Sequence, residues 1–217
     1  WLSPLLYNTE EADAVRQIAG GDIWKGPQAT KKHFMENAAD YRILHLSTHG
    51  KANDESGDNS FLAFQPAKDS TENNLLYASE LYNLRLNADL VVLSACETGI
   101  GEWQRGEGII SLARGFSFAG AKSIITSLCS VNDRSTRDLM ENFYRHLKTG
   151  MPKDAALRQA QLDYLANSPN PEPYFWAGFI SIGDMSAVEM QERWGFGIWL
   201  AAGVMALLFA LLWRWKR

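Results

Sequence analysis

Apolar runs of strand length alternate with segments of helical spacing through the first 185 residues. The runs typical of buried strands cover residues 41–46, 90–95 and 123–128. Helical spacing predicts helices over residues 9–19, 30–39, 108–118, 135–148 and 152–166. Strands that alternate with helices form parallel sheets covered on both faces. The pattern therefore predicts an α/β fold with a mainly parallel sheet.

Two details refine this prediction. Asp133 and Ser135 are candidate caps for the fourth helix, because short polar side chains accept hydrogen bonds from a helix's first free N–H groups. Residues 51–74, KANDESGDNSFLAFQPAKDSTENN, are polar around the short apolar segment FLAF. We expect them to form a loop or hairpin beside the sheet.

The C-terminal segment has a different pattern. Residues 196–212, FGIWLAAGVMALLFALL, are 17 residues without a charge, enough for a short membrane-spanning helix at about 1.5 Å per residue. Tryptophans lie toward its ends, where indoles prefer the bilayer interface. The alternative, a buried core helix, requires a protein surface all around it. We predict a linker over residues 186–195, a transmembrane helix over 196–213 that contacts the lipid bilayer, and a basic tail over 214–217.

Charges flanking the predicted span bear on its orientation. Arg214, Lys216 and Arg217 follow the span, whereas Arg193 precedes it. The positive-inside rule then favours a cytoplasmic tail and an extracytoplasmic domain, although a tail anchor inserted after synthesis would have the opposite orientation. The chain starts at Trp1 with no signal-peptide pattern, so we expect the domain to be truncated at its N-terminus.

Composition restricts the possible functions. The chain has 217 residues, 46% of them hydrophobic, and is long enough to bury a sizeable core. A net charge of −4 argues against nucleic-acid binding, which usually requires a basic surface. Two cysteines are too few for a disulfide framework or a four-cysteine zinc site.

Reactive residues follow all three predicted strands: STHG at 47–50, CETG at 96–99 and CSVND at 129–133. Catalytic groups of open α/β sheets lie outside the carboxyl ends of the strands. A cysteine nucleophile needs a base within about 2.6–3.2 Å. Cys96 and His49 are therefore a candidate nucleophile and base, and the N–H groups of Gly50 and Cys96 are candidate donors to an oxyanion. Alternatively, Cys96 packs as a small buried hydrophobe.

His45 lies within a predicted strand, four residues before His49, and is better interpreted as a core histidine with satisfied hydrogen bonds. A metal site formed by His45, His49 and Cys96 has too few obvious ligands. We therefore predict no cofactor and no metal.

Several quoted stretches resemble a known family, in order and with ordinary spacing: YRILHLSTHG, LVVLSACETGIGEWQRGEGIISLARGFSFAGAKSIITSL, VNDRSTRDLMENFYRHL and YFWAGFISIG. They resemble the CHAT domain, a caspase-like domain commonly found downstream of tetratricopeptide repeats. The resemblance covers residues 5–183 and implies a domain over 1–185. The implied fold is a caspase-haemoglobinase-like three-layer α/β sandwich, with upstream tetratricopeptide repeats as partners.

The resemblance also implies roles for particular residues. The family's peptidases have one strand ending in His-Gly and another in Ala-Cys, which are His49-Gly50 and Ala95-Cys96 here. In them the histidine is the general base and the cysteine attacks a peptide carbonyl, so the implied substrate is a protein or peptide. The position two before the cysteine, Ser94, would line the pocket for the residue preceding the cut. Glu97 and Asp133 fall on other family positions and are candidate substrate contacts.

One departure from the family and one functional alternative remain. Cys129 stands where many CHAT domains have tryptophan, and it is either a free thiol or a disulfide partner of Cys96 in an oxidising compartment.

Together with the predicted membrane span, the resemblance implies a membrane-anchored cysteine endopeptidase in a bacterial signalling or defence system. The alternative is a non-catalytic scaffold or interaction domain with the same fold.

Overall fold

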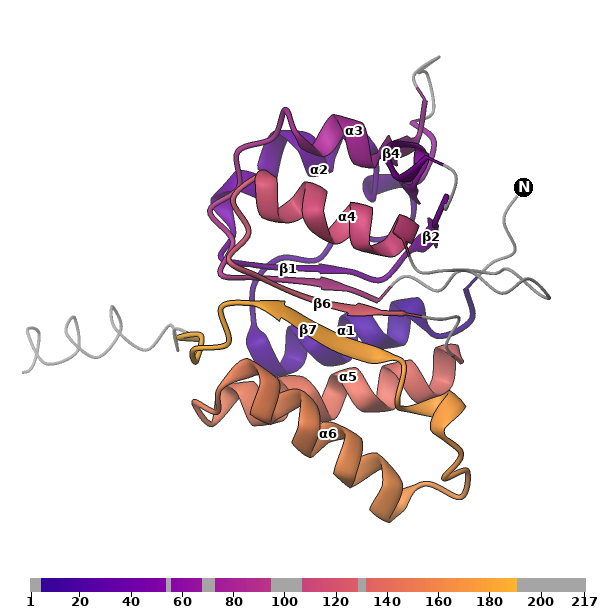
Figure 1. The fold of residues 1–217 in the computed structure, drawn as a ribbon, viewed down its shortest axis with the longest axis vertical. Coiled ribbons are helices and arrows are strands. Elements are labelled where there is room, and N and C mark those ends of the chain that lie inside the picture. The colour runs from indigo at the N-terminus through magenta and orange to yellow at the C-terminus, as the bar shows by residue number, and fades with distance from the viewer. Residues whose placement is uncertain (1–4, 54–55, 68–72, 95–106, 129–131, 191–217) are drawn as a thin grey trace, which may run out of the picture.

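The main sheet lies between two layers of helices in the computed structural model, which describes residues 5–53, 56–67, 73–94, 107–128 and 132–190 (Figure 1). The strand order is β1-β5-β6-β7. Strands β1, β5 and β6 are parallel, and β7 is antiparallel to β6. Their bounds are Ile43–Leu46, Leu90–Leu93, Ser123–Ser127 and Phe179–Gly183. The predicted mainly parallel α/β sheet is confirmed.

Helices cover both faces of this sheet, as the alternating pattern predicts (Figure 1). One layer contains α1 (Asn8–Ala19), α5 (Asp133–Lys148) and α6 (Lys153–Asn167). The other contains α2 (Lys31–Asn37), α3 (Ala78–Leu81) and α4 (Glu107–Phe118). The short 3₁₀ helices are η1 (Gly26–Gln28), η2 (Ala38–Asp40), η3 (Gly57–Asn59) and η4 (Pro173–Phe175).

Strand β5 shows how the sheet divides the core into two parts. Leu90 and Val92 pack with the layer of α1, α5 and α6, whereas Val91 and Leu93 pack with the layer of α2, α3 and α4. Successive side chains of a strand point to opposite faces, so a central strand covered on both faces is apolar at every position. This explains why LVVL reads as a continuous apolar run.

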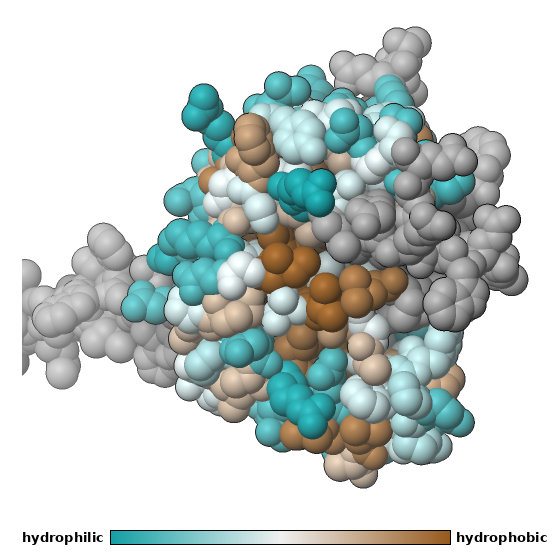
Figure 2. All heavy atoms as spheres, in the orientation of Figure 1, coloured by the Kyte–Doolittle hydropathy of each residue, from teal (hydrophilic) through white to brown (hydrophobic). Residues whose placement is uncertain are grey.

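The strand β7 forms one edge of the sheet. Its Ile180 and Ile182 are only half-buried. Figure 2 shows apolar side chains gathered over β7 at the centre of this face. The edge strand therefore contributes an apolar surface to the molecule.

The predicted hairpin over residues 51–74 is confirmed, and it forms part of a small antiparallel sheet in the order β2-β3-β4. Strand β3 (Phe61–Ala63) lies within the predicted segment, and β2 (His49–Lys51) and β4 (Leu75–Tyr77) lie at its two ends. Leu62 and Leu76 are fully buried and join the core beneath α4. The segment FLAF thus supplies the central strand of a small sheet.

The prediction that Asp133 or Ser135 caps α5 is wrong, because the N-cap is Asn132. Asn132 has the extended backbone of an N-cap, and its side chain accepts hydrogen bonds from the N–H groups of Arg134 and Ser135 at 3.1 and 3.2 Å. Asp133 is already the first helical residue. A capping side chain must precede the helix to reach the second or third N–H group.

The predicted transmembrane helix, residues 196–213, lies outside the described residues, as do residues 191–195 of the predicted linker and the basic tail. Within the described ranges, none of the helices combines the length and apolar character needed to cross a bilayer. Val188, which follows the last strand, is buried in the core beside α5 and α6.

Asp89 joins the amino ends of the parallel strands. Its carboxylate accepts a hydrogen bond from Lys122 Nζ at 2.8 Å and another from Arg42 Nε, and its carbonyl accepts one from Ser123 Oγ at 2.6 Å. Burial alone would raise the pKa of Asp89, but the hydrogen bonds from Lys122 and Arg42 outweigh it and lower the pKa below its usual value. The ionised form is therefore the one that stabilises the fold.

Asp89→Asn is expected to lower the free energy of unfolding at pH 7 by about 1–3 kcal/mol, because the amide has no negative charge and replaces one of the two acceptor oxygens with an NH2 donor that faces Lys122 or Arg42. A carboxyl with a lowered pKa stabilises the fold above its unfolded pKa, and this contribution is lost as pH falls through the folded pKa. The difference from wild type should thus shrink below about pH 4. Urea unfolding at several pH values measures it. Asp13→Asn, at an exposed ion pair with Lys25, is the control; an equal loss there would contradict the prediction.

Candidate active site

The carboxyl ends of β1 and β5 lie side by side. Leu46, the last residue of β1, accepts a backbone hydrogen bond from the N–H group of Ser94 at 3.0 Å. Ser94 directly follows β5. The parallel register therefore continues one residue past the end of β5, and both chains leave the sheet at the same edge. This edge is where an open α/β sheet binds its ligands.

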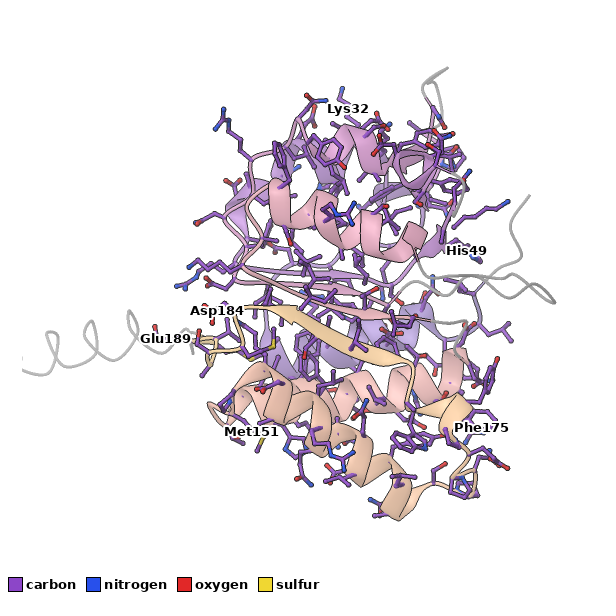
Figure 3. The ribbon with its side chains drawn as sticks, viewed as in Figure 1. Lys32, His49, Met151, Phe175, Asp184 and Glu189 are labelled. Carbon is purple, nitrogen blue, oxygen red and sulfur yellow. The ribbon has the colours of Figure 1, made fainter. Side chains whose placement is uncertain are left out.

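His49 lies three residues after the end of β1, at the start of β2. It is paired with Ala63 of β3, and the neighbouring Thr48 Oγ1 donates a hydrogen bond to the Ala63 carbonyl. Gly50 follows opposite Leu62. His49 and Gly50 are both partly exposed, and Figure 3 shows His49 beyond the ends of the parallel strands. The two sheets together thus hold His49 beyond the carboxyl ends of the parallel strands.

Cys96 and Glu97 lie outside the described residues, and so does Cys129. In the sequence, Cys96 follows Ser94 by two positions. The described residues therefore include the ends of β1 and β5, which lead to His49 and Cys96. Of these two residues, His49 is described with its side chain.

Ser94 is 3% exposed, and its Oγ has no hydrogen-bond partner among the described residues. Buried hydroxyl groups are normally hydrogen-bonded, so an unpartnered one requires an explanation. It directly follows β5, at the edge where both chains leave the sheet.

Asp133 has a structural contact. Its Oδ2 accepts a hydrogen bond from the backbone N–H of Leu6 at 3.2 Å, which ties the segment before α1 to the start of α5. Asp133 follows β6, whose end lies two strands, about 10 Å, from the end of β1. Asp133 and His49 thus come from different parts of the same edge.

The prediction that His45 is a satisfied core histidine is confirmed. Its Nε2 lies 2.8 Å from Glu11 Oε1, and its Nδ1 lies 3.2 Å from the Tyr144 hydroxyl. The His45 and Glu11 side chains are only 9% and 4% exposed. Both ring nitrogens are engaged by protein groups, which leaves His45 no nitrogen for a metal ion.

Glu11 is a residue that the sequence argument missed. Besides His45, it accepts a hydrogen bond from Ser47 Oγ at 3.2 Å. A signal was present: Glu11, Val15 and Ile18 follow helical spacing on the face of α1 that packs against the sheet. A carboxylate among apolar positions of a helix indicates a buried polar partner.

Two pockets formed by described residues lie away from His49. The larger, about 870 Å³, runs between α5, α6 and η4 and includes Asn132 and Asp133. The smaller, about 500 Å³, lies beside Trp24 and His33. Neither has His49 or Ser94 in its lining, and of the described candidate site residues only Asp133 lines one of them.

The sheet order, the two helical layers and the strand-end site define a caspase-like α/β fold. A solved structure with this architecture is the Arg-specific cysteine proteinase gingipain R, at a TM-score of 0.53 and 12% identity; the match covers 83% of this chain and 41% of that one. The CHAT domain family model matches residues 1–184, and the chain belongs to that family.

Curated relatives extend the comparison. Tetratricopeptide repeat protein 28 of Mus musculus is 27% identical over 84% of this chain, and its Homo sapiens counterpart is 26% identical over the same share. This chain spans 9% of the length of each. The comparison therefore concerns one domain of much longer proteins.

Proposed function

We propose that this CHAT domain is a cysteine endopeptidase in which His49 and Cys96 form the catalytic dyad. The observation that carries the proposal is the hydrogen bond between Ser94 N–H and the Leu46 carbonyl at 3.0 Å. It holds side by side the two strand ends from which His49 and Cys96 follow, three and two residues later. The fold shared with a cysteine proteinase adds support.

The proposed chemistry is acyl transfer through a thioester. His49 accepts the Cys96 thiol proton as the sulfur attacks the peptide carbonyl, and the protonated imidazole then protonates the leaving amine. His49 next accepts a proton from the water that attacks the thioester, and it returns this proton to the sulfur as the C–S bond breaks, which restores the thiol and the neutral imidazole. The backbone N–H groups of Gly50 and Cys96 stabilise the oxyanion that forms on the carbonyl oxygen.

Three further residues are proposed to contact substrate. Ser94 lines the pocket for the side chain that precedes the cut, and its small neutral side chain selects for neither an acidic nor a basic residue. Its buried Oγ, without a partner among the described residues, supports this placement. Glu97 and Asp133 are the other proposed contacts.

The proposed setting is a membrane surface. The apolar residues 196–213 would anchor the domain through residues 186–195, with the basic tail favouring an extracytoplasmic domain. The similarity to tetratricopeptide repeat protein 28 supports upstream repeats that bind a partner and control access to the site.

Irreversible labelling with a peptidyl electrophile tests the dyad. The reduced wild-type chain is expected to be labelled on Cys96, Cys96→Ala to remain unlabelled, and His49→Ala to be labelled more slowly. Cys129→Ala is the matched control and should be labelled as wild type. Intact-mass and peptide-mass measurements identify the labelled residue.

Each other outcome has a defined meaning. Labelling that persists in Cys96→Ala overturns the peptidase assignment, and equal rates with and without His49 remove only the proposed base. A reduced wild-type chain that takes up no label, in the full-length protein with its upstream region, would favour a scaffold domain. Comparing the masses of reduced and unreduced protein separates a Cys96–Cys129 disulfide from an unreactive thiol.

A further inference from the structure

We propose that Glu11 is a positioning residue that holds His49 in place through Ser47. The inference rests on the proposed function, because it assigns a supporting group to the same dyad. Glu11 lies on α1, distant in sequence from His49, and its side chain is 4% exposed. A buried carboxylate is costly unless it is paired, so its partners indicate what it does.

The contacts around Glu11 form one connected network. The Tyr144 hydroxyl lies 3.2 Å from His45 Nδ1, and His45 Nε2 lies 2.8 Å from Glu11 Oε1. Ser47 Oγ donates to the other carboxylate oxygen, Oε2, at 3.2 Å. Each carboxylate oxygen therefore has a partner, and both partners belong to the segment that leads through β1 to His49.

Only Ser47 and Thr48 separate β1 from β2, where His49 begins the small sheet. Each residue of this connection is fixed by a different element. The Leu46 carbonyl accepts from Ser94 N–H, Ser47 Oγ donates to Glu11, and Thr48 Oγ1 donates to the Ala63 carbonyl. Of these contacts, the one with Glu11 comes from the helical layer and ties the connection to α1.

Packing alone does not explain a carboxylate at this position. An apolar side chain of similar volume in place of a buried charged group is often neutral or stabilising. An apolar residue would, however, accept no hydrogen bond from Ser47. A displacement of about 1 Å in a catalytic group can lower a rate about 100-fold, so the hydrogen bond from Ser47 gives this carboxylate a role beyond its pairing with His45.

A double-mutant cycle tests whether Ser47 acts through His49. Ser47→Ala is expected to lower the rate constant for labelling of Cys96 by a peptidyl electrophile about tenfold. In a His49→Ala background, the same substitution should have no further effect, because the group that it positions is gone. Ser47→Thr, which keeps the hydroxyl, should restore most of the rate, and Glu11→Ala should reproduce the loss.

Thr149→Ala is the matched control. Its hydroxyl donates to the His146 carbonyl at the far end of α5, and the labelling rate should be unchanged. A tenfold loss from Ser47→Ala that persists without His49 overturns the positioning role, as does a Ser47→Ala rate equal to wild type.

A second measurement does not depend on catalysis. The ¹H–¹³C resonance of the His49 ring is expected to shift in Ser47→Ala, whereas those of His33 and His146 should stay in place. The four histidines can be assigned by substitution. A His49 resonance that does not move overturns the proposal. A labelling rate that is the same with and without His49, with the resonance shifted, instead removes only His49 as the base of the proposed function. Labelling that persists in Cys96→Ala overturns the proposed function, while the shifted resonance still supports the positioning by Ser47.

Discussion

Substitution of His49 by alanine is expected to lower kcat/KM for peptide cleavage by about 10²- to 10⁴-fold, the usual contribution of a positioned general base. Without the imidazole, the Cys96 thiol must lose its proton to solvent, and the leaving amine has no proton donor. The fold should survive, because His49 is partly exposed in a short strand of the small sheet. Cleavage of a fluorogenic peptide selected from a library with the wild-type chain measures the ratio.

His146→Ala is the matched control for this effect. His146 lies on α5, and its Nε2 is 2.6 Å from Asp163 Oδ2. Its ring contacts Asp163 and is not proposed to contact substrate. The His146→Ala variant should therefore change kcat/KM by no more than about twofold once the rates are corrected for any small loss of stability. Equal rates for wild type and His49→Ala at matched folded fractions would exclude His49 as the base.

The main sheet could be predicted because its central strands leave a clear pattern in the sequence. Strands such as β5 are buried on both faces, so they appear as uninterrupted apolar runs. The small sheet could not be predicted in the same way. Its strands have three residues each, too short for a repeating pattern, and mostly polar connections surround the short apolar segments that contain the buried Leu62 and Leu76.

The candidate site was only partly predictable from sequence. Ser94 was indicated by the resemblance to the CHAT family, whereas the strand-end rule found His49, which lies three residues after an apolar run. It also separated His45, which lies within a strand and is buried against Tyr144 and Glu11. The role of Glu11 depends on a contact between segments 34 residues apart, and no local pattern specifies which strand a helix covers.

The largest loss of stability is expected for Phe143→Ala, about 3–5 kcal/mol. Phe143 is completely buried in the core where α5 meets the sheet. Its ring packs edge-on against the ring of Tyr144, at a centroid distance of 5.5 Å. Removal of the ring forfeits its burial and leaves a cavity that the strands and helices around it cannot fill. Thermal and urea unfolding of the full chain measure the change.

Phe118→Ala is the matched control, because Phe118 also lies on a helix but is 72% exposed. Its loss should cost less than about 1 kcal/mol, including its edge contact with Tyr82. Equal losses at the two positions would mean that the α5 layer does not form the stabilising core. Because the hydroxyl of Tyr144, beside Phe143, lies 3.2 Å from His45 Nδ1, Phe143→Ala should in addition loosen the Glu11 network and slow labelling of Cys96. Phe118→Ala, in the opposite layer, should leave that rate unchanged.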